Sequence, residues 1–351
     1  MRNLLNLPKF DLHLHMEGAI PLESLFELQI GENPSLDFEN FKDRFNFQHF
    51  GQFIELWCEH QTLLFKNLSP EQILPPITQA IAKNLSMQKV IYAEAHISPI
   101  DSLFMRYGKD DFLQNQGFYE EVLLTWDQAV DSLNSNPEMP RIHLIVDLVR
   151  NYPKEVFNWQ VGILQKLSSR LKQVIGVGLG GGGTKKRLID FFEGFQKLKQ
   201  NGFKIFMHAG ELPPAEKAVQ EVKDALEIGV HRIGHGIQCY GDRNLLDCLV
   251  QKSIPLEVCP TSNLKTGSIK DLVQHPFPEL FTAGVPIVIG SDDPTYFGTN
   301  LNSEYEKIQN TFGLVDSDLL KLFRNSYQYS FAPEHLKREA LEGLANGYYQ
   351  D

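Results

Sequence analysis

The sequence of 351 residues contains 33 Lys and Arg side chains against 44 Asp and Glu side chains, a formal net charge of -11. This acidic balance argues against nucleic acid and anionic membrane surfaces as general partners. No apolar run approaches the roughly 18 residues that a membrane-spanning helix needs, so we expect a soluble protein that acts on a small molecule.

The first residues and the cysteines indicate the compartment. Residues 1–8 are too short and too polar for a secretory signal, so a cytoplasmic location is expected. The four cysteines have no C-x-x-C spacing and lie mostly in apolar surroundings, which favours buried free thiols over disulfides or a zinc knuckle. The sequence also lacks the H-x-E and P-C-x-x-C elements that hold zinc in deaminases of the cytidine type.

Eight short apolar and β-branched runs alternate with amphipathic stretches of helical spacing, such as 155–172 and 187–200. The expected strands are residues 10–15, 90–98, 141–150, 174–180, 203–211, 232–236, 254–262 and 286–293. Parallel strands need helical crossovers, and a count of eight favours a closed TIM (β/α)8 barrel over an open doubly wound sheet. Since no interdomain linker or internal repeat is visible, residues 1–351 are expected to form one α/β barrel domain.

The first two connections, 16–89 and 99–140, are much longer than one helix requires. We expect extra helices there, at 21–30 and 41–65, because the loops that follow barrel strands build the active site. The second of these segments is rich in large apolar residues, most of which should pack on the barrel while a few form an apolar wall for the ligand: Phe45, Phe47, Phe50, Phe53, Leu56, Trp57 and Leu64. Residues 314–349 are predicted to form two or three helices that extend the barrel at its carboxyl terminus.

Polar residues end several of the expected strands. The fifth apolar run stops at His208-Ala209-Gly210-Glu211, and charged or polar groups at the end of a buried strand are costly unless a ligand, metal or substrate satisfies them. His235 ends the sixth strand, and Asp292 and Asp293 end the eighth. All of these positions lie where a barrel keeps its active site.

The first strand carries Asp11-Leu12-His13-Leu14-His15, and its period of two places both histidines on one face. Two such histidines can share a metal ion, although an isolated H-x-H pair is more often structural. His96 ends the second strand, where a structural role is the commoner outcome and an approach to the pocket is the alternative.

Four motifs in this order, PKFDLHLHMEGA, HAGE, RIGHG and SDDP, resemble the adenosine deaminase family of zinc hydrolases, which includes adenosine and adenine deaminases of the metal-dependent amidohydrolase superfamily. The resemblance spans nearly the whole chain. It implies one Zn2+ held by four residues: His13, His15, His208 and Asp292. It makes Glu211 the proton donor to the purine and His235, with Asp292, the group that holds the attacking water. The residues implied to contact substrate are His15, Glu17, Gly181 and Asp293.

The chemistry of these residue types agrees with that implication. Imidazole and carboxylate groups suit zinc, which lowers the pKa of a bound water to about 7. Binuclear relatives bridge two metals through a residue at the end of strand four, but that strand ends here in Gly180-Gly181-Gly182-Gly183, so one zinc is expected. Glu211 must be protonated to donate to a purine nitrogen, and so must Asp293 if it meets N7; an apolar pocket favours both.

Two departures from the family pattern concern the substrate. Adenosine deaminases usually have Asp where this chain has Glu17, and relatives usually have an acidic pair where this chain continues with glycines. Lys185 and Lys186 follow that glycine loop; they either extend into solvent or, in the first turn of a helix beginning near Thr184, meet an anionic group on the substrate.

The expected reaction is the hydrolytic deamination of adenosine or deoxyadenosine, giving the 6-oxopurine nucleoside and ammonia. Free adenine and an acidic 5′ derivative of adenosine are the alternative substrates. A zinc amidohydrolase of another C–N bond and a non-catalytic ligand-binding relative are the alternatives from other classes.

Overall fold

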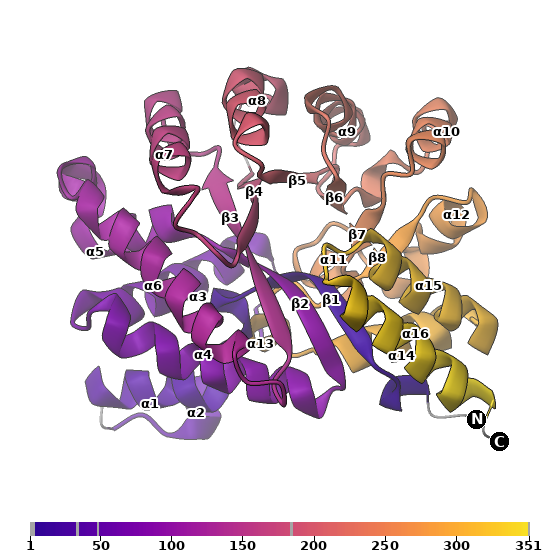
Figure 1. Ribbon diagram of the computed structural model, residues 1–351, viewed down its shortest axis with the longest axis horizontal. Helices are drawn as coiled ribbons and strands as arrows, with labels where there is room; N and C mark the ends of the chain where they lie inside the picture. The colour runs from indigo at the N-terminus through magenta and orange to yellow at the C-terminus, as the bar shows by residue number, and fades with distance from the viewer. Residues whose placement is uncertain (1–3, 33–34, 48, 183–184, 350–351) are drawn as a thin grey trace.

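The computed structural model describes residues 4–32, 35–47, 49–182 and 185–349, and within them eight parallel strands form one sheet in sequence order (Figure 1). The strands are β1 (Lys9–His15), β2 (Val90–Ile97), β3 (Arg141–Val149), β4 (Val174–Gly180), β5 (Lys204–Ala209), β6 (Arg232–His235), β7 (Leu256–Val258) and β8 (Ile287–Ile289). Each is followed by at least one helix, as parallel neighbours require. The expected TIM barrel is confirmed.

The barrel closes between β8 and β1 through the backbone of Asp292. The N–H of His15 donates to Asp292 O at 2.9 Å, and the N–H of Asp292 donates to His13 O at 2.8 Å. Leu14 and Asp292 accordingly form a parallel bridge just beyond the end of β8. The seam of the barrel therefore runs through three of the residues expected to act in the site.

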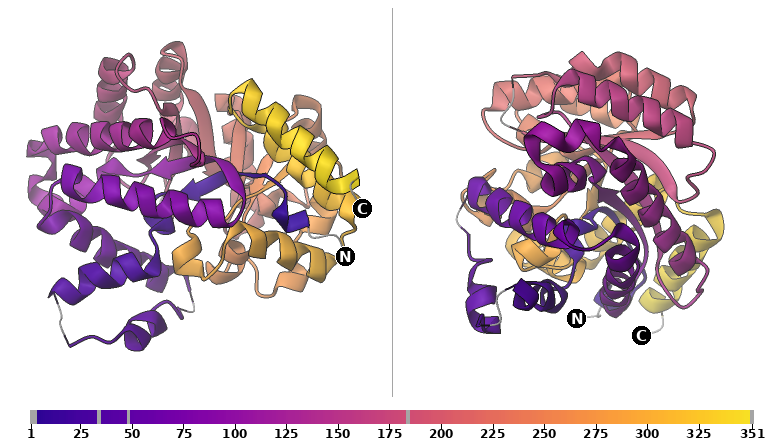
Figure 2. Two further views of the ribbon diagram at one scale, coloured as in Figure 1. Left: turned by 60° about the horizontal axis from the view of Figure 1, so that its bottom comes forward. Right: turned by 90° about the vertical axis from the view of Figure 1, so that its left-hand side faces the viewer.

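The two long connections hold the extra helices that were expected. After β1 come the 3-10 helix η2 (Glu17–Ala19) and then α1 (Leu22–Glu32), α2 (Phe38–Asp43), α3 (Phe50–Lys66) and α4 (Pro70–Met87). After β2 come α5 (Pro99–Asp111), η3 (Phe112–Gln114) and α6 (Gln116–Asn134). These helices crowd one side of the barrel in Figures 1 and 2.

The later connections are shorter. They contain α7 (Lys154–Leu167) after β3, η4 (Leu188–Phe191) and α8 (Phe192–Gln200) after β4, α9 (Ala215–Ile228) after β5, and η5 (Ile237–Cys239) and α10 (Arg243–Lys252) after β6. After β7 come α11 (Pro260–Lys265), η6 (Leu272–Gln274) and α12 (Phe277–Thr282), and after β8 come α13 (Pro294–Phe297) and α14 (Leu301–Phe312). None of the described helices is long and apolar enough to cross a lipid bilayer.

The carboxyl terminus adds two helices, α15 (Asp316–Tyr329) and α16 (Glu334–Tyr349), after the expectation of two or three. They return to the start of the chain, as both views of Figure 2 show. The Tyr327 hydroxyl donates to Pro8 O, and a Cβ on Gly343 would lie 2.9 Å from Pro8 Cγ. The extension therefore packs against the amino-terminal segment that leads into β1.

Six of the expected strands are shorter than predicted, β7 and β8 by the most. β7 stops at Val258 because Pro260 begins α11; proline has no N–H to give to a sheet but suits the first turn of a helix. The segment 41–65, expected as one helix, is divided between α2 and α3. All four cysteines are free thiols, two of them buried (Cys239 and Cys259) and two half-buried (Cys58 and Cys248).

Candidate metal centre and active site

Three histidines and one aspartate meet at the carboxyl ends of β1, β5 and β8. His15 Nε2 lies 3.2 Å from His208 Nε2 and 3.3 Å from Asp292 Oδ1, and His13 Nε2 lies 3.6 Å from the same oxygen. Zinc bonds of about 2.0–2.2 Å place neighbouring ligand atoms about 3–3.6 Å apart. Three of the pairs among the four residues that the sequence singled out thus have the spacing of ligands that share one ion.

The donor atoms of this cluster fit a metal. His13 Nε2 is buried and has no hydrogen-bond partner among the described residues, a costly state for a polar atom. Burial and neighbouring histidines lower the pKa of His15 to about 4 and the pKa of His208 well below its usual value. Both rings are therefore neutral at pH 7, which is the form that binds a metal.

His13 is held in place by Glu257, which the sequence did not reveal. Its Nδ1 lies 2.7 Å from Glu257 Oε2, so Nε2 is the atom left to face the cluster. Arg232 Nε donates to the other oxygen of Glu257, and a second guanidinium nitrogen lies 2.6 Å from Glu94 Oε2. All four side chains are buried. A carboxylate behind a metal-binding histidine fixes the ring and increases its basicity.

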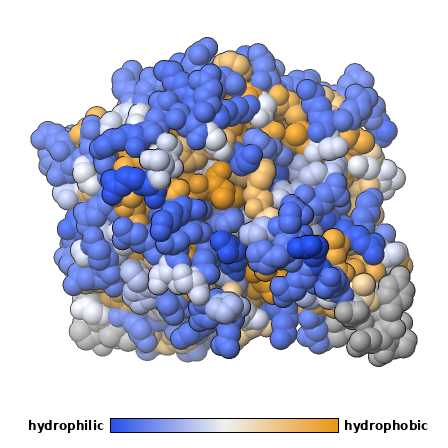
Figure 3. Space-filling model, in the orientation of Figure 1, coloured by the Kyte–Doolittle hydropathy of each residue, from blue (hydrophilic) through white to orange (hydrophobic). Residues whose placement is uncertain are grey.

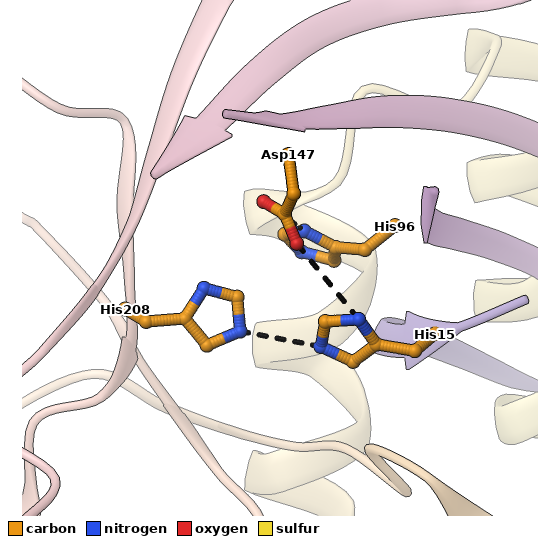
Figure 4. A group of neighbouring side chains, drawn as sticks. All are labelled: His15, His96, Asp147 and His208. Carbon is orange, nitrogen blue, oxygen red and sulfur yellow. Dashed lines mark hydrogen bonds and ion pairs between the residues drawn. The ribbon is translucent and has the colours of Figure 1, made fainter. Parts of the chain in front are cut away.

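A second group beside this cluster consists of His15, His208, His96 and Asp147 (Figure 4). His96 Nδ1 lies 3.0 Å from Asp147 Oδ1, and Asp147 Oδ2 lies 3.8 Å from His15 Nδ1. His96 does not line the cavity; it lies behind the cavity wall, hydrogen-bonded to Asp147. Asp147, at the end of β3, gave no sequence signal. Its carboxylate faces His15 Nδ1, whereas Asp292 faces His15 Nε2.

Asp292 and His235 both have left-handed backbone conformations, with φ of +61° for each. Such conformations are uncommon for residues with a Cβ, and they cluster at functional sites because the surrounding structure must hold them. The conformation of Asp292 is held by its two backbone hydrogen bonds to His13 and His15 of β1. At His235 the ring itself is held: its Nδ1 lies 3.2 Å from the side-chain amide of Asn263, whose Oδ1 lies 3.2 Å from His275 Nε2.

The pKa values of the adjacent residues Asp292 and Asp293 are shifted in opposite directions. Burial opposes the ionisation of Asp292, but its hydrogen bond and electrostatic interaction with His13 help to hold its pKa well below the usual value. Burial and the charge of Asp292 raise the pKa of Asp293 well above the usual value. The anionic form of Asp292 and the protonated, hydrogen-bond-donating form of Asp293 are therefore favoured.

Glu211 follows β5 and faces the same space. Its Oε2 lies 3.7 Å from His235 Nε2, and Thr266 donates a hydroxyl hydrogen bond to its Oε1 at 3.3 Å. Burial raises the pKa of Glu211, which favours the protonated form. The distance between Glu211 and His235 is too long for a hydrogen bond but suits one bridging water or substrate atom.

Glu17 lies differently from the expected position. Its side chain is only 2% exposed, and Oε1 accepts a hydrogen bond from the backbone N–H of Ser98 at 2.8 Å. Ser98 and Asp101, rather than Glu17, line the cavity that contains the site. The longer arm of glutamate lets its carboxylate reach the start of α5, so Glu17 supports the cavity wall from behind.

Gly181 lines the cavity as expected and has φ of +89°, a conformation that favours glycine. A Cβ there would also lie 2.1 Å from Asn151 Oδ1. Arg150 Nε donates to Gly181 O at 2.6 Å and Asn151 Nδ2 donates to Gly182 O at 2.8 Å, so the first part of the glycine loop is tied to β3. Gly183 and Thr184 lie outside the described residues.

Lys185 and Lys186 do not line this cavity. The Lys186 ammonium group donates to the backbone carbonyls of Arg150, at 3.1 Å, and of Tyr152. No helix begins directly after residue 184 in the part of the chain that is described; η4 starts at Leu188. The idea that this pair meets an anionic substrate group is therefore wrong for Lys186, whose charge stabilises the loop that follows β3.

The site opens into one cavity of about 900 Å³. Of the apolar residues expected to cover the mouth, Phe50, Phe53 and Trp57 on α3 line the cavity. The others are buried in the core: Phe45, Phe47, Leu56 and Leu64. A cavity of this size lies at the upper end of the range for small-molecule sites.

Comparison with known proteins agrees with this geometry. The family described as adenosine deaminase matches residues 8–347. The chain is 29% identical to an adenine deaminase of Acinetobacter baylyi (96% of each chain) and 31% identical to an aminodeoxyfutalosine deaminase of Streptomyces coelicolor (93% of this chain and 80% of the relative). The crystal structure of an adenine deaminase from Arthrobacter aurescens superposes with a TM-score of 0.82 at 25% identity, covering 97% of this chain and 98% of that one. The chain therefore belongs to the adenosine deaminase family.

Proposed function

We propose that this protein is a zinc-dependent deaminase that hydrolyses the 6-amino group of an aminopurine, with adenosine or deoxyadenosine as substrate. One observation carries the proposal: two carboxyl groups with raised pKa, Glu211 and Asp293, share a cavity with the imidazole and carboxylate cluster. A general amide hydrolase has no use for two neutral acids placed to donate to ring nitrogens. An intact cluster equally argues against a non-catalytic relative.

The residues that would hold the metal are His13, His15, His208 and Asp292, a nitrogen and oxygen donor set that suits zinc. When bound, zinc supplies a Lewis acid that lowers the pKa of water and so provides a nucleophile at neutral pH. Glu257 and Asp147 act from behind by fixing His13 and His15.

Glu211 is the proposed proton donor to N1 of the ring. Attack at C6 breaks the aromaticity of the purine, and the negative charge that develops on N1 must be met by a proton. The raised pKa of Glu211 keeps that proton on the carboxyl group until the charge appears. Thr266 limits the rotation of the carboxyl group, since its hydroxyl donates to Oε1.

Asp293 is the proposed donor to N7 on the other edge of the ring. N7 is an acceptor, so only a protonated carboxyl group can bind it, and the neighbouring anion of Asp292 keeps Asp293 in that form. Together with Gly181, Glu211 and Asp293 would orient the ring so that C6 faces the ligand cluster. The two acids would also discriminate against rings that lack both nitrogens.

His235 and Asp292 are proposed to hold the attacking water and to accept its proton. His235 Nε2 lies 3.9 Å from Asp292 Oδ2 and 3.7 Å from Glu211 Oε2, distances that one oxygen can bridge. After water adds to C6, the C6–N bond would break and the amino group would leave as ammonia with the first proton removed from the water. The second water proton, still on the oxygen at C6, would return to Glu211 and replace the one given to N1. The 6-oxopurine remains.

Free adenine is the second candidate substrate, because the relatives from Acinetobacter baylyi and Arthrobacter aurescens are named adenine deaminases. The name of the Streptomyces coelicolor relative gives aminodeoxyfutalosine as a third. The test is to add zinc-loaded protein to each of these compounds, to adenosine and to deoxyadenosine, and to follow ammonia release with the loss of absorbance near the adenosine maximum. Release of ammonia from none of them would contradict the proposal.

A further inference from the structure

We propose that Asn263 and His275 are positioning residues that keep the ring proton of His235 on Nε2. His235 then donates a hydrogen bond to the attacking water, and Asp292 alone accepts the first proton of that water. This inference rests on the proposed function and deepens it, since it gives the two groups beside the water different roles. The hydrogen-bonded series from Phe277 through His275 and Asn263 to His235 is defined here as the His235 network.

The direction of the hydrogen bonds in the His235 network is set at the backbone N–H of Phe277. This N–H is the first of helix α12, and its nitrogen lies 3.0 Å from His275 Nδ1. A backbone N–H can only donate, so Nδ1 accepts and carries no proton. Burial lowers the pKa of His275 to about 4, so the ring is neutral at pH 7 and holds one proton. That proton is therefore on Nε2.

The side-chain amide of Asn263 passes this direction on to His235. His275 Nε2 lies 3.2 Å from Asn263 Oδ1, and it donates because it carries the ring proton. With its oxygen facing His275, the amide presents its NH2 group to the other ring, and Nδ2 lies 3.2 Å from His235 Nδ1. An amide NH2 group only donates, so His235 Nδ1 accepts and the proton of this ring is left on Nε2.

The side chains of the His235 network are buried, and the backbone of its middle member is fixed. Asn263 is 0% exposed, and His235 and His275 are each 2% exposed. The N–H of Asn263 donates to Cys259 O at 2.9 Å, and its carbonyl oxygen accepts from the N–H of Ile269 at 3.1 Å. Because a buried polar group that loses its partner is costly, these hydrogen bonds favour one arrangement of the amide.

The Nε2 atom of His235 faces the space proposed for the attacking water. It lies 3.7 Å from Glu211 Oε2 and 3.9 Å from Asp292 Oδ2. A water between these groups can accept a hydrogen bond from Nε2 while it directs one of its own protons to Asp292. A nitrogen that already carries a proton cannot take another, so the first proton of the water passes to Asp292 and His235 keeps its own.

The same segment of the chain also holds the proposed proton donor. Asn263 and Thr266 both follow β7, within α11 and at its end, as Figure 1 shows for the helix. The Thr266 hydroxyl donates to Glu211 Oε1 at 3.3 Å, and its backbone N–H donates to Ser262 O at 2.8 Å. One short stretch of chain therefore fixes both the group that holds the water and the group that protonates the ring.

Asn263 and His275 lie behind the cavity wall, which makes them suitable for a test. The cavity is lined by His235 but not by these two residues. The hydrophobic residues that gather on the face shown in Figure 3 surround the positions that Figure 1 labels β3 and β4, whereas both network residues follow β7. Substituting Asn263 or His275 removes no direct contact with a substrate, so each acts on the reaction through another residue.

The first test locates the ring protons directly. Zinc-loaded protein with 15N-labelled histidine is studied by NMR at pH 7, where the protonated and the bare nitrogen of a neutral imidazole resonate far apart. His235→Gln and His275→Gln, each of which lacks one ring, assign the signals. We expect the proton on Nε2 in both rings. A proton on Nδ1 of His235, or on both of its nitrogens, would overturn this inference and leave the proposed function standing.

The second test is kinetic and uses the aminopurine that the wild-type protein deaminates. In His275→Leu, the Asn263 amide can turn its oxygen to His235 and draw the ring proton to Nδ1. We expect kcat to fall at least about ten-fold and KM to stay within about two-fold, because a catalytic group in the wrong tautomer is poorly placed for the reaction. His275→Gln offers an N–H near the position of Nε2 and should keep kcat within about three-fold of the wild type.

His231→Leu is the matched control. His231 Nδ1 also accepts a backbone N–H at 3.0 Å, from Ile205, and burial lowers its pKa to about 4 as well. Its ring packs against Phe206 and Phe331 and does not line the cavity. This variant loses the same kind of contact as His275→Leu, but its kcat should stay within about two-fold of the wild type.

The outcomes separate the two levels of the proposal. Unchanged kcat in His275→Leu, or equal losses in His275→Leu and His275→Gln, would contradict the positioning role alone. The zinc content of each variant is measured alongside, and a loss of zinc in His275→Leu equal to its loss of kcat would assign the effect to the metal centre instead. Absence of ammonia release by zinc-loaded wild-type protein would overturn the proposed function as well.

Discussion

Asp147 of β3 fills the space that a side chain on Gly178 of β4 would occupy. The two residues are register partners, and a Cβ on Gly178 would lie 2.0 Å from Asp147 Oδ1. Although β4 ends in glycines, a carboxylate therefore still lies beside the ligand cluster next to this strand. The neighbouring strand provides one, and from there it reaches both His15 and His96.

Gly178→Ala should displace the Asp147 carboxylate and loosen His15. We expect zinc affinity and kcat to fall about 10- to 100-fold, the usual cost of losing a group that orients a metal ligand. Gly162→Ala on α7 is the control, since a Cβ there meets nothing within 4 Å. Zinc titration of the metal-free proteins measures the effect; unchanged affinity in Gly178→Ala would mean that Asp147 does not orient His15.

Metal analysis of protein purified without chelator should give about one zinc per chain. His13, His15, His208 and Asp292 can surround one ion, while the His96 and Asp147 side chains bind each other. Two tightly held metals per chain would show that His96 and Asp147 form a second site. Full activity with no metal would contradict the zinc mechanism altogether.

Glu257→Gln should weaken zinc binding without changing the ligand set. A neutral amide in place of the carboxylate lowers the basicity of His13, and affinity should drop about 10- to 100-fold. The same substitution leaves Arg232 with Glu94 as its one remaining carboxylate, so the free energy of unfolding should also fall, but by less than the roughly 3–5 kcal/mol that an uncompensated buried charge costs. Urea unfolding with excess zinc separates the two effects.

Glu211→Gln should keep zinc and fold but lose at least about three orders of magnitude in kcat, the scale of a missing proton donor. The pH dependence follows from the raised pKa of Glu211: the donor is present below that pKa and is lost as pH rises through it. Wild-type kcat should therefore fall on the alkaline side, and the residual rate of the variant should lack that limb. Near-normal kcat in Glu211→Gln would assign the proton to another group.

Gly18→Ala should reproduce much of the effect of Asp293→Asn. A Cβ at Gly18 would lie 1.9 Å from Asp293 Oδ1. Alanine at this position must therefore push the Asp293 carboxyl group away from the place proposed for the purine ring. Both variants should lose about 10- to 100-fold in kcat/KM, as one hydrogen bond to the substrate is removed. Their activity on a 7-deaza analogue, which has no N7 acceptor, should match that of the wild type. A loss on the analogue equal to the loss on adenosine would argue against contact with N7.

The sequence predicted the residues whose signal is local. A histidine or carboxylate at the end of an apolar run is visible without a structure, which is why His208, His235 and Asp292 could be selected as candidates. Glu257 and Glu94 lie inside strands and meet Arg232 only once the barrel is assembled, although charges within apolar runs are themselves a sign that partners must exist. The position of Glu17 depended on the length of its arm and on where α5 begins, and neither can be read from a motif.

Because the barrel closes through Asp292, the ligand cluster forms only when the first and the last strand are both present. His13 and His15 come from the first strand, whereas Asp292 follows the last one, and its backbone is hydrogen-bonded to both histidines. A nascent chain on the ribosome can fold its early β/α units while the later ones are still being made. It cannot assemble the ligand cluster until the eighth strand has emerged and joined the first, so truncated translation products should be inert however well they fold.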